Sequence, residues 1–154
     1  EAIKLIMSLL IYHILLVVSQ FSHVSEDSTS LKMDKYRLTV SFTNAKKDWY
    51  GKKMYMAAWK KGSNGFPEVG TQDEYQTFWL KSEKKSGTFQ LEKGAYAVSC
   101  YLDLNGNKKL DYNMWGAPKE PYCFSNNFTP IFSAPDFSDC SFYLSQDKEI
   151  QLKA

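Results

Sequence analysis

Apolar and polar residues alternate along much of the chain from residue 35 onward. In the segment KYRLTVSFT, the apolar residues Leu38, Val40 and Phe42 are separated by single polar residues. Met54 and Met56 repeat the same spacing in KKMYMAAWK. Since successive side chains of a strand point to opposite faces, a period of two predicts strands with one buried face.

Further segments have the length and composition of strands, and clusters of Gly, Asn, Pro, Ser and Lys separate them. They are Tyr75–Leu80, Thr88–Leu91, Tyr96–Leu102, Phe128–Phe132, Ser141–Leu144 and Glu149–Leu152. No segment beyond the N-terminal region shows the apolar stripe of a helix. Around seven to eight short strands predict an all-β fold, an antiparallel β-sandwich over residues 35–154.

Two long connections interrupt this series of strands. They are the segments 60–73 and 103–127. A sandwich of about 130 residues buries about two-thirds of its unfolded surface, so it folds without needing a metal or a disulfide. Function is therefore expected in the long loops that the sandwich holds in place.

The N-terminal region has the layout of a secretory signal peptide. An apolar run, Leu5–Val18, follows Lys4 and precedes a stretch of polar and small residues. The run is shorter than the ~20 residues of a membrane span, although an uncleaved anchor stays an alternative. We predict a signal peptide at 1–25, a linker at 26–34, and a periplasmic or extracellular protein with no other membrane contact.

The charge distribution argues against a nucleic-acid partner. The formal net charge is only +2. The lysine pairs at positions 46/47, 52/53, 60/61, 84/85 and 108/109 are scattered between apolar segments, whereas a nucleic-acid site needs basic residues gathered on one face. We expect these lysines on solvated loops and strand ends.

The cysteine count is odd. Cys100, Cys123 and Cys140 leave at least one thiol unpaired within the chain. In an oxidising compartment Cys123 and Cys140 are the favoured bridge, because Cys100 lies within an apolar strand pattern. Three free thiols are the alternative.

Histidine is absent from the predicted domain, since His13 and His23 are the only two in the chain. This excludes Ser-His-Asp and Cys-His nucleophilic systems and histidine zinc sites, and it removes the commonest general base. No Gly-rich phosphate loop or dinucleotide fingerprint occurs. We expect a protein that is not an enzyme.

The second long connection begins with an oxygen-rich segment, DLNGNKKLD. Side-chain oxygens fall at its positions 1, 3, 5 and 9, which are Asp103, Asn105, Asn107 and Asp111. This spacing matches the first half of an EF-hand Ca²⁺ loop, but Lys108 replaces the Gly of position 6 and Met114 the Glu of position 12. The prediction is a turn whose Asp and Asn side chains bond their own backbone, or a weak Ca²⁺ site.

Aromatic residues follow in the same connection. Trp115 stands before Gly116 and Pro118, and we expect it to pack against the end of the sandwich, as aromatics under long loops usually do. The alternative is a carbohydrate- or peptide-binding site within 112–127. Its candidate residues are Trp115, Glu120, Tyr122, Asn126 and Asn127. A carboxylate pair for glycosidic acid-base chemistry has the least support.

The segment GAYAVSCYLDLNGNKKLDYNMWGAPKEPYCFSNN resembles a known bacterial family, domain of unknown function 2141. The family pattern is roughly G-x-Y-A, H-D-x-N-x-N-G-x-x-D, G-x-P-x-E and F-S-N-N, and the similarity covers residues 36–153. The matching positions are Asp103, Asn105, Asn107, Asp111, Gly116, Pro118, Glu120, Phe124, Ser125, Asn126 and Asn127. The chain departs from the pattern at Leu102, where the family has His, and at Lys108, where it has Gly.

This resemblance implies an exported β-sandwich similar to transthyretin-like or immunoglobulin-like folds, with no established activity. Together with the residues, it leads us to expect an exported, non-catalytic protein whose Asp103 turn is structural or weakly Ca²⁺-binding. A module that binds a glycan or a peptide through the loop 112–127 is the alternative.

Overall fold

The computed structural model describes residues 34–68, 70–131 and 133–153. The predicted signal peptide, 1–25, lies outside the described residues, as does the predicted linker except for Asp34. No helix in the described part of the chain is long and apolar enough to cross a membrane.

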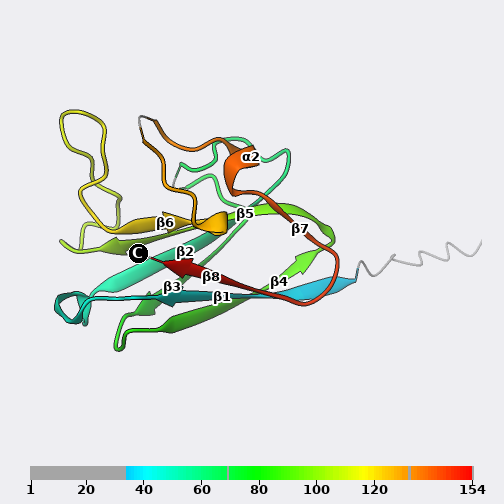
Figure 1. Cartoon of the computed structure of the whole chain (residues 1–154), viewed down its shortest axis with the longest axis horizontal. Coiled ribbons are helices and arrows are strands. Elements are labelled where there is room, and N and C mark those ends of the chain that lie inside the picture. The colour runs from blue at the N-terminus through cyan, green and yellow to red at the C-terminus, as the bar shows by residue number, and fades with distance from the viewer. Residues whose placement is uncertain (1–33, 69, 132, 154) are drawn as a thin grey trace, which may run out of the picture. The chain divides into compact units, whose positions relative to one another are not determined.

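The described residues form eight strands and three short helical turns (Figure 1). The strands are β1 (Lys35–Thr43), β2 (Lys53–Lys60), β3 (Glu74–Trp79), β4 (Lys85–Glu92), β5 (Gly94–Asp103), β6 (Tyr122–Phe124), β7 (Phe142–Leu144) and β8 (Lys148–Lys153). The helical turns are η1 (Lys47–Trp49), η2 (Ser125–Asn127) and α2 (Phe137–Cys140). The all-β prediction is confirmed.

The strands form two packed sheets, so the predicted β-sandwich is confirmed as well. One sheet has three strands in the order β4-β1-β8, with β1 antiparallel to β4 and parallel to β8. The other has five strands in the order β3-β2-β5-β6, and β7 also pairs with β5. All pairs in this five-stranded sheet are antiparallel.

The core lies between the two sheets and is built from the alternating apolar positions. Leu38, Val40 and Phe42 of β1 are almost completely buried, and so are Met54 and Met56 of β2. Each such side chain contributes about 1.5–3 kcal/mol by leaving water. The period of two seen in the sequence is therefore the pattern of side chains that face this core.

The opposite face of the five-stranded sheet, which we call the outer face, is aromatic. In the strand register Tyr55 stands opposite Tyr101, and Tyr101 stands opposite Tyr122. In the next row Ser99 stands opposite Phe124. These side chains alternate with core residues, so they point away from the core.

The long connections lie over this outer face, on the side of the five-stranded sheet away from β1 and β8 (Figure 1). Phe66, from the connection between β2 and β3, packs edge-on against Trp59, Phe124 and Phe137 with ring centroids 5.2–6.0 Å apart. The outer face thus carries a second, smaller apolar cluster, and the loops above it are held against the sheet.

The predicted strand Phe128–Phe132 is wrong, since its described residues 128–131 are irregular. The strand that pairs with β5 is β6, immediately upstream. Asn126 and Asn127 have φ of 61° and 50°, which turns the chain away from the sheet, and Pro130 has no N–H for a ladder. A three-residue strand gives too short an alternation to detect.

The predicted bridge between Cys123 and Cys140 is also wrong, and all three cysteines are free. Cys123 faces the main core, where it stands opposite Cys100. Cys140 belongs to the smaller cluster with Ala97 and Phe124 on the outer face. The five-stranded sheet separates the two thiols that the prediction paired.

Candidate functional site

Asp103 ends β5 and starts the oxygen-rich turn, 103–111. Its side chain is buried, with 2% of its surface exposed. Oδ1 accepts a hydrogen bond from the Gly106 N–H at 2.6 Å, and Oδ2 accepts one from the Lys108 N–H at 2.9 Å. Both carboxylate oxygens are thereby used to fold the chain back on itself.

The middle of the turn is held by its own amides. Asn105 and Asn107 both donate from Nδ2 to Oδ2 of Asp111. Their Oδ1 atoms accept the N–H groups of Asn107 at 3.0 Å and Lys109 at 2.8 Å. The structure therefore brings Asn105, Asn107 and Asp111 together, as a network closed by local bonds of the Asx-turn kind.

The Glu120 side chain connects the two ends of this turn through hydrogen bonds. It is buried, and its Oε1 accepts the Leu104 N–H at 2.7 Å while Oε2 accepts the Asp111 N–H at 3.2 Å. The backbone adds a bond from the Lys119 N–H to the Asp111 carbonyl at 2.8 Å. The structure places Glu120 inside the loop as a support.

The turn needs a positive φ at Lys108. Lys108 has φ of 65°, in the left-handed region that glycine adopts without a Cβ penalty. The Gly of the family pattern at this position suits the same backbone. The fold thus tolerates a strained lysine where the turn needs a positive φ.

The donor set of the turn fits hydrogen bonding better than it fits a cation. Ca²⁺ takes about six to eight oxygen ligands, whereas the oxygens of Asp103, Asn105 and Asn107 already accept N–H groups. Among the described residues no group of three His, Cys, Asp or Glu side chains could hold a metal ion. A bound cation would have to displace several of these bonds.

The second half of the connection builds a cavity of about 380 Å³ over the outer face of the sheet. Its walls come from the segment 110–118, from residues 130, 131 and 133–135, from Pro67 and from the outer residues of β5 and β6. None of the described residues that line it is charged. Its volume lies within the ~300–1,000 Å³ range of small-molecule sites.

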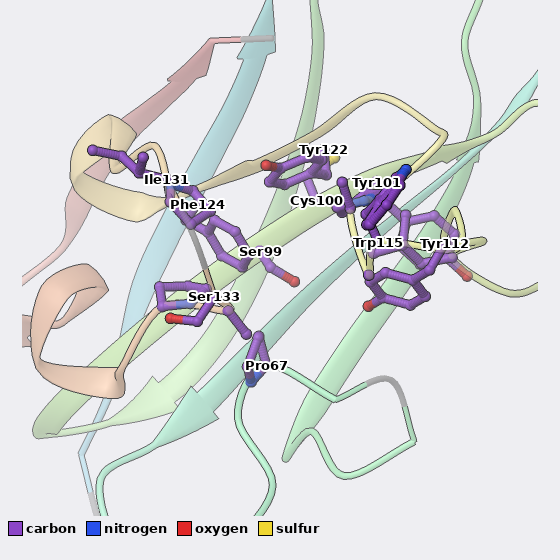
Figure 2. Close-up of a pocket in the computed structure, with 17 residues that line it drawn as sticks. Pro67, Ser99, Cys100, Tyr101, Tyr112, Trp115, Tyr122, Phe124, Ile131 and Ser133 are labelled. Atoms are coloured by element: carbon purple, nitrogen blue, oxygen red, sulfur yellow. The ribbon is translucent and has the colours of Figure 1, made fainter.

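Figure 2 shows how the cavity is arranged. Trp115 and Tyr112 lie on one side, and Phe124 and Ile131 lie on the other. The Ser99 hydroxyl points into the space between them. A polar group at the floor and aromatic groups at the sides form the usual layout of a site for a small molecule.

The expectation that Trp115 packs against the sandwich is wrong. Its side chain is 86% exposed at the edge of the cavity. Asn113 fixes the turn beneath it, because Oδ1 accepts the N–H groups of Trp115 at 2.9 Å and Ala117 at 3.0 Å. Gly116 completes the turn with φ of 78°. The indole is thus presented to solvent by a well-bonded backbone.

Two phenol groups around the cavity, those of Tyr112 and Tyr101, have a raised pKa. Burial raises the pKa of Tyr112, and the charge of Glu68 raises it further. Burial likewise raises the pKa of Tyr101 well above its usual value, and the charge of Tyr55 adds to the shift. Both hydroxyls keep their protons at any physiological pH, so the cavity offers hydrogen bonds without charge.

The predicted ligand-binding residues divide between cavity and scaffold. Trp115 and Tyr122 line the cavity, whereas Glu120, Asn126 and Asn127 do not. Asn126 donates from Nδ2 to the carbonyls of residues 139 and 141, and Asn127 Oδ1 accepts the N–H of residue 153 at 2.9 Å. These two asparagines join η2 to α2 and β8.

Several lining residues escaped the sequence reasoning because they come from distant segments. Pro67 belongs to the first long connection, Ile131 lies in the segment mistaken for a strand, and Ser133 follows that segment. The one local signal was Ser99, a polar residue in an apolar strand. A period-two reading of β5 places Ser99 on the outer face with Tyr101.

Comparison with known proteins gives a family without a described activity. The sequence model of a family described as uncharacterized protein conserved in bacteria (DUF2141) matches residues 22–152. Neither the curated proteins nor the solved structures compared contain a match.

Proposed function

The chain belongs to the uncharacterised bacterial family DUF2141, and within it we propose that this protein is an exported, non-catalytic binding module. Its ligand is a neutral saccharide, held in the cavity between Trp115 and Phe124 on the outer face of the five-stranded sheet. Export is supported by the apolar run at 5–18 and the polar stretch after it.

The observation that carries the proposal is the exposure of Trp115. Large apolar side chains are usually buried, and an exposed apolar patch beside a cavity marks a binding surface. Here Tyr112 and Ile131 are exposed as well, at the same cavity. The Asn113 side chain accepts the N–H groups of Trp115 and Ala117 and so fixes the backbone that carries the indole.

The chemistry of the cavity favours a saccharide over other small ligands. A sugar ring has an apolar face that packs on an aromatic ring and hydroxyl groups that need neutral partners. The walls supply aromatic rings, while Ser99, Tyr112 and Tyr122 supply hydroxyl groups. No charged residue among those described lines the cavity, so a charged ligand would lose its hydration without a counter-ion.

The absence of catalytic groups at the cavity supports binding without turnover. The described domain contains no histidine, and hydrolysis of a glycosidic bond needs two carboxylates that flank it. The buried carboxylates nearby, Asp103 and Glu120, accept backbone N–H groups and do not line the cavity.

For the turn 103–111 we propose a structural role, with weak Ca²⁺ binding as the alternative. The test is the variant Asp111→Asn, compared by thermal unfolding in millimolar CaCl₂ and in chelator. The structural role predicts the same loss of melting temperature in both buffers. A loss of melting temperature that appears only in CaCl₂ would show that the turn binds Ca²⁺.

The binding proposal is tested on a glycan array and a peptide array probed with the labelled domain. Trp115→Ala is the test variant, and Trp79→Ala is its matched control, because Trp79 is an exposed tryptophan that does not line this cavity. We expect neutral glycans to bind the wild type and Trp79→Ala but not Trp115→Ala. Binding of peptides alone, or of glycans equally by both variants, would contradict the proposal.

A further inference from the structure

A second cleft, of about 340 Å³, lies on the same sheet at the other side of the Asp103 turn. It is formed where β2 begins, where β3 ends and where the turn leaves β5. Its lining residues include Gly51, Lys53, Tyr55, Trp79, Gly106 and Lys108. None of these residues lines the aromatic cavity.

Positive charge is concentrated in this cleft. Lys52, Lys53 and Lys108 supply three cations against the single carboxylate of Asp103, which two backbone N–H groups already satisfy. The lysine pair 52/53 and Lys108 looked scattered in the sequence, but the register that sets Lys53 opposite Asp103 brings them together.

Within the described part of the chain, these lysines have no carboxylate partner. The ion pairs found among the described residues join Arg37 to Asp147 and Lys60 to Glu92. Lys52 instead donates from Nζ to the Leu104 carbonyl at 2.6 Å. The cleft therefore holds an excess of positive charge that no other part of the described chain neutralises.

A buried hydroxyl without a partner lines the same cleft. The Tyr55 hydroxyl is buried and has no hydrogen-bond partner among the described residues. Its ring is fixed by stacking on Tyr101, with centroids 4.8 Å apart. Leaving a buried polar group without a hydrogen bond is unfavourable, so a ligand atom that accepts a hydrogen bond from this hydroxyl would be stabilised there.

The remaining wall is apolar and open to solvent. The Trp79 side chain is 60% exposed, and it lies opposite Lys53 in the register of β2 and β3. A flat ring next to cationic groups suits a ligand that combines a planar or ring-shaped body with a negative group.

We propose that this cleft binds the oxyanion group of a small molecule, a carboxylate or a phosphate, between Lys53 and Lys108 with the body of the ligand against Trp79. The site is separate from the saccharide cavity, so either proposal can fail without the other.

The experiment is a titration of the ¹⁵N-labelled protein at low ionic strength, followed by NMR. The probes are inorganic phosphate and D-glucuronate, and D-glucose is the neutral control with the same ring. We expect saturable shifts at the Trp79 indole and at the Gly51 and Gly106 amides with both anions and none there with glucose. Shifts that do not saturate, or that appear at Trp115 instead, would overturn the proposal.

Two adjacent lysines provide a matched pair of variants. Lys108 lines the cleft and Lys109 does not, although both are exposed. Lys108→Gln should weaken phosphate binding about fivefold, because one of three cations is lost in a partly solvated site. Lys109→Gln should leave the dissociation constant unchanged. Equal weakening of phosphate binding by both variants would show that only the overall charge matters, and it would contradict a specific site in the cleft.

The variant Tyr55→Phe separates ligand binding from folding. Removing an unsatisfied buried hydroxyl should leave the melting temperature equal or higher. It should also weaken phosphate binding about threefold, because one donor is lost. Unchanged affinity would remove Tyr55 from the site, and an unstable variant with unchanged affinity would make the hydroxyl a folding group.

Discussion

The segment 103–121, from the last residue of β5 to the start of β6, has two halves that differ in which side chains they bury. In the first half the charged side chain of Asp103 is 2% exposed, whereas in the second half the indole of Trp115 is 86% exposed. In most proteins charged side chains are exposed and large aromatic side chains are buried. The difference indicates that the polar half holds the loop in shape, while the aromatic half is presented to a ligand.

The hydrogen bonds of the polar half, which we call the base, fix the backbone on which the aromatic half stands. The carboxylates of Asp103 and Glu120 each accept two backbone N–H groups, and bonds of this charged kind are worth about 1.5–3 kcal/mol. Glu120 and the Lys119 N–H both join Asp111 to the far side of the aromatic turn. Loss of the base should therefore disturb the cavity, whereas loss of the indole should leave the base intact.

Removing Glu120 should have the largest effect on the polar half. Glu120→Ala leaves the partly buried N–H groups of Leu104 and Asp111 without acceptors, so we expect the free energy of unfolding to fall by about 3 kcal/mol. Urea denaturation measures it, and Lys119→Ala, an exposed neighbour, is the control with a change within about 0.5 kcal/mol. A loss below about 1 kcal/mol for Glu120→Ala would mean that the hydrogen bonds of Glu120 do not stabilise the loop.

A smaller loss is expected when one acceptor is replaced and the shape is kept. Asp103→Asn turns an amide N–H₂ toward one of the two backbone N–H groups, and we expect a loss of about 2 kcal/mol. Differential scanning calorimetry measures it against Asp48→Asn, an exposed acid in η1. Equal melting temperatures for the two variants would contradict the assigned role of Asp103.

Relieving the strained residue of the turn should produce a gain. Lys108→Gly removes the Cβ penalty of a positive φ, which outweighs the extra freedom of glycine in the unfolded chain, so we expect about 0.5 kcal/mol of added stability. Lys109→Gly has no positive φ to relieve and should lose stability. If chemical denaturation orders the two variants the other way, the strain assigned to Lys108 is wrong.

The smallest effect on stability is expected in the aromatic half. Trp115→Ala removes an indole that lies in solvent, so the free energy of unfolding should change by no more than about 0.5 kcal/mol. Trp59→Ala, at a fully buried tryptophan, should cost about 3–5 kcal/mol under the same urea titration. A large loss of stability for Trp115→Ala would mean that Trp115 packs against the sandwich, and it would contradict the contrast between the two halves.

The sequence predicted the fold well because the alternation is local. Leu38, Val40 and Phe42 face the core as their spacing requires. β6 escaped detection because three residues are too few for a pattern, and the left-handed turn at Asn126 follows at once. The Asp103 turn was foreseen as an Asx-rich element because its bonds run between residues only a few positions apart.

The cavity and the cleft could not be predicted because they depend on contacts between distant segments. The exposure of Trp115 depends on how the turn at Asn113 is oriented over the sheet. Ile131 reaches the same cavity from another loop, and Lys53 meets Lys108 through the pairing of β2 with β5. No periodicity reports such pairings, so residue types alone left Trp115 as a packing residue.

The most direct test of the central claim is an NMR map of the saccharide that binds best on the array. We predict that the largest shifts fall on the Trp115 indole and on the amides of Ser99, Gly116 and Ala117, while the amides of the turn 104–111 stay in place. The largest shifts within that turn, or on the three-stranded sheet, would contradict the division between a holding half and a binding half.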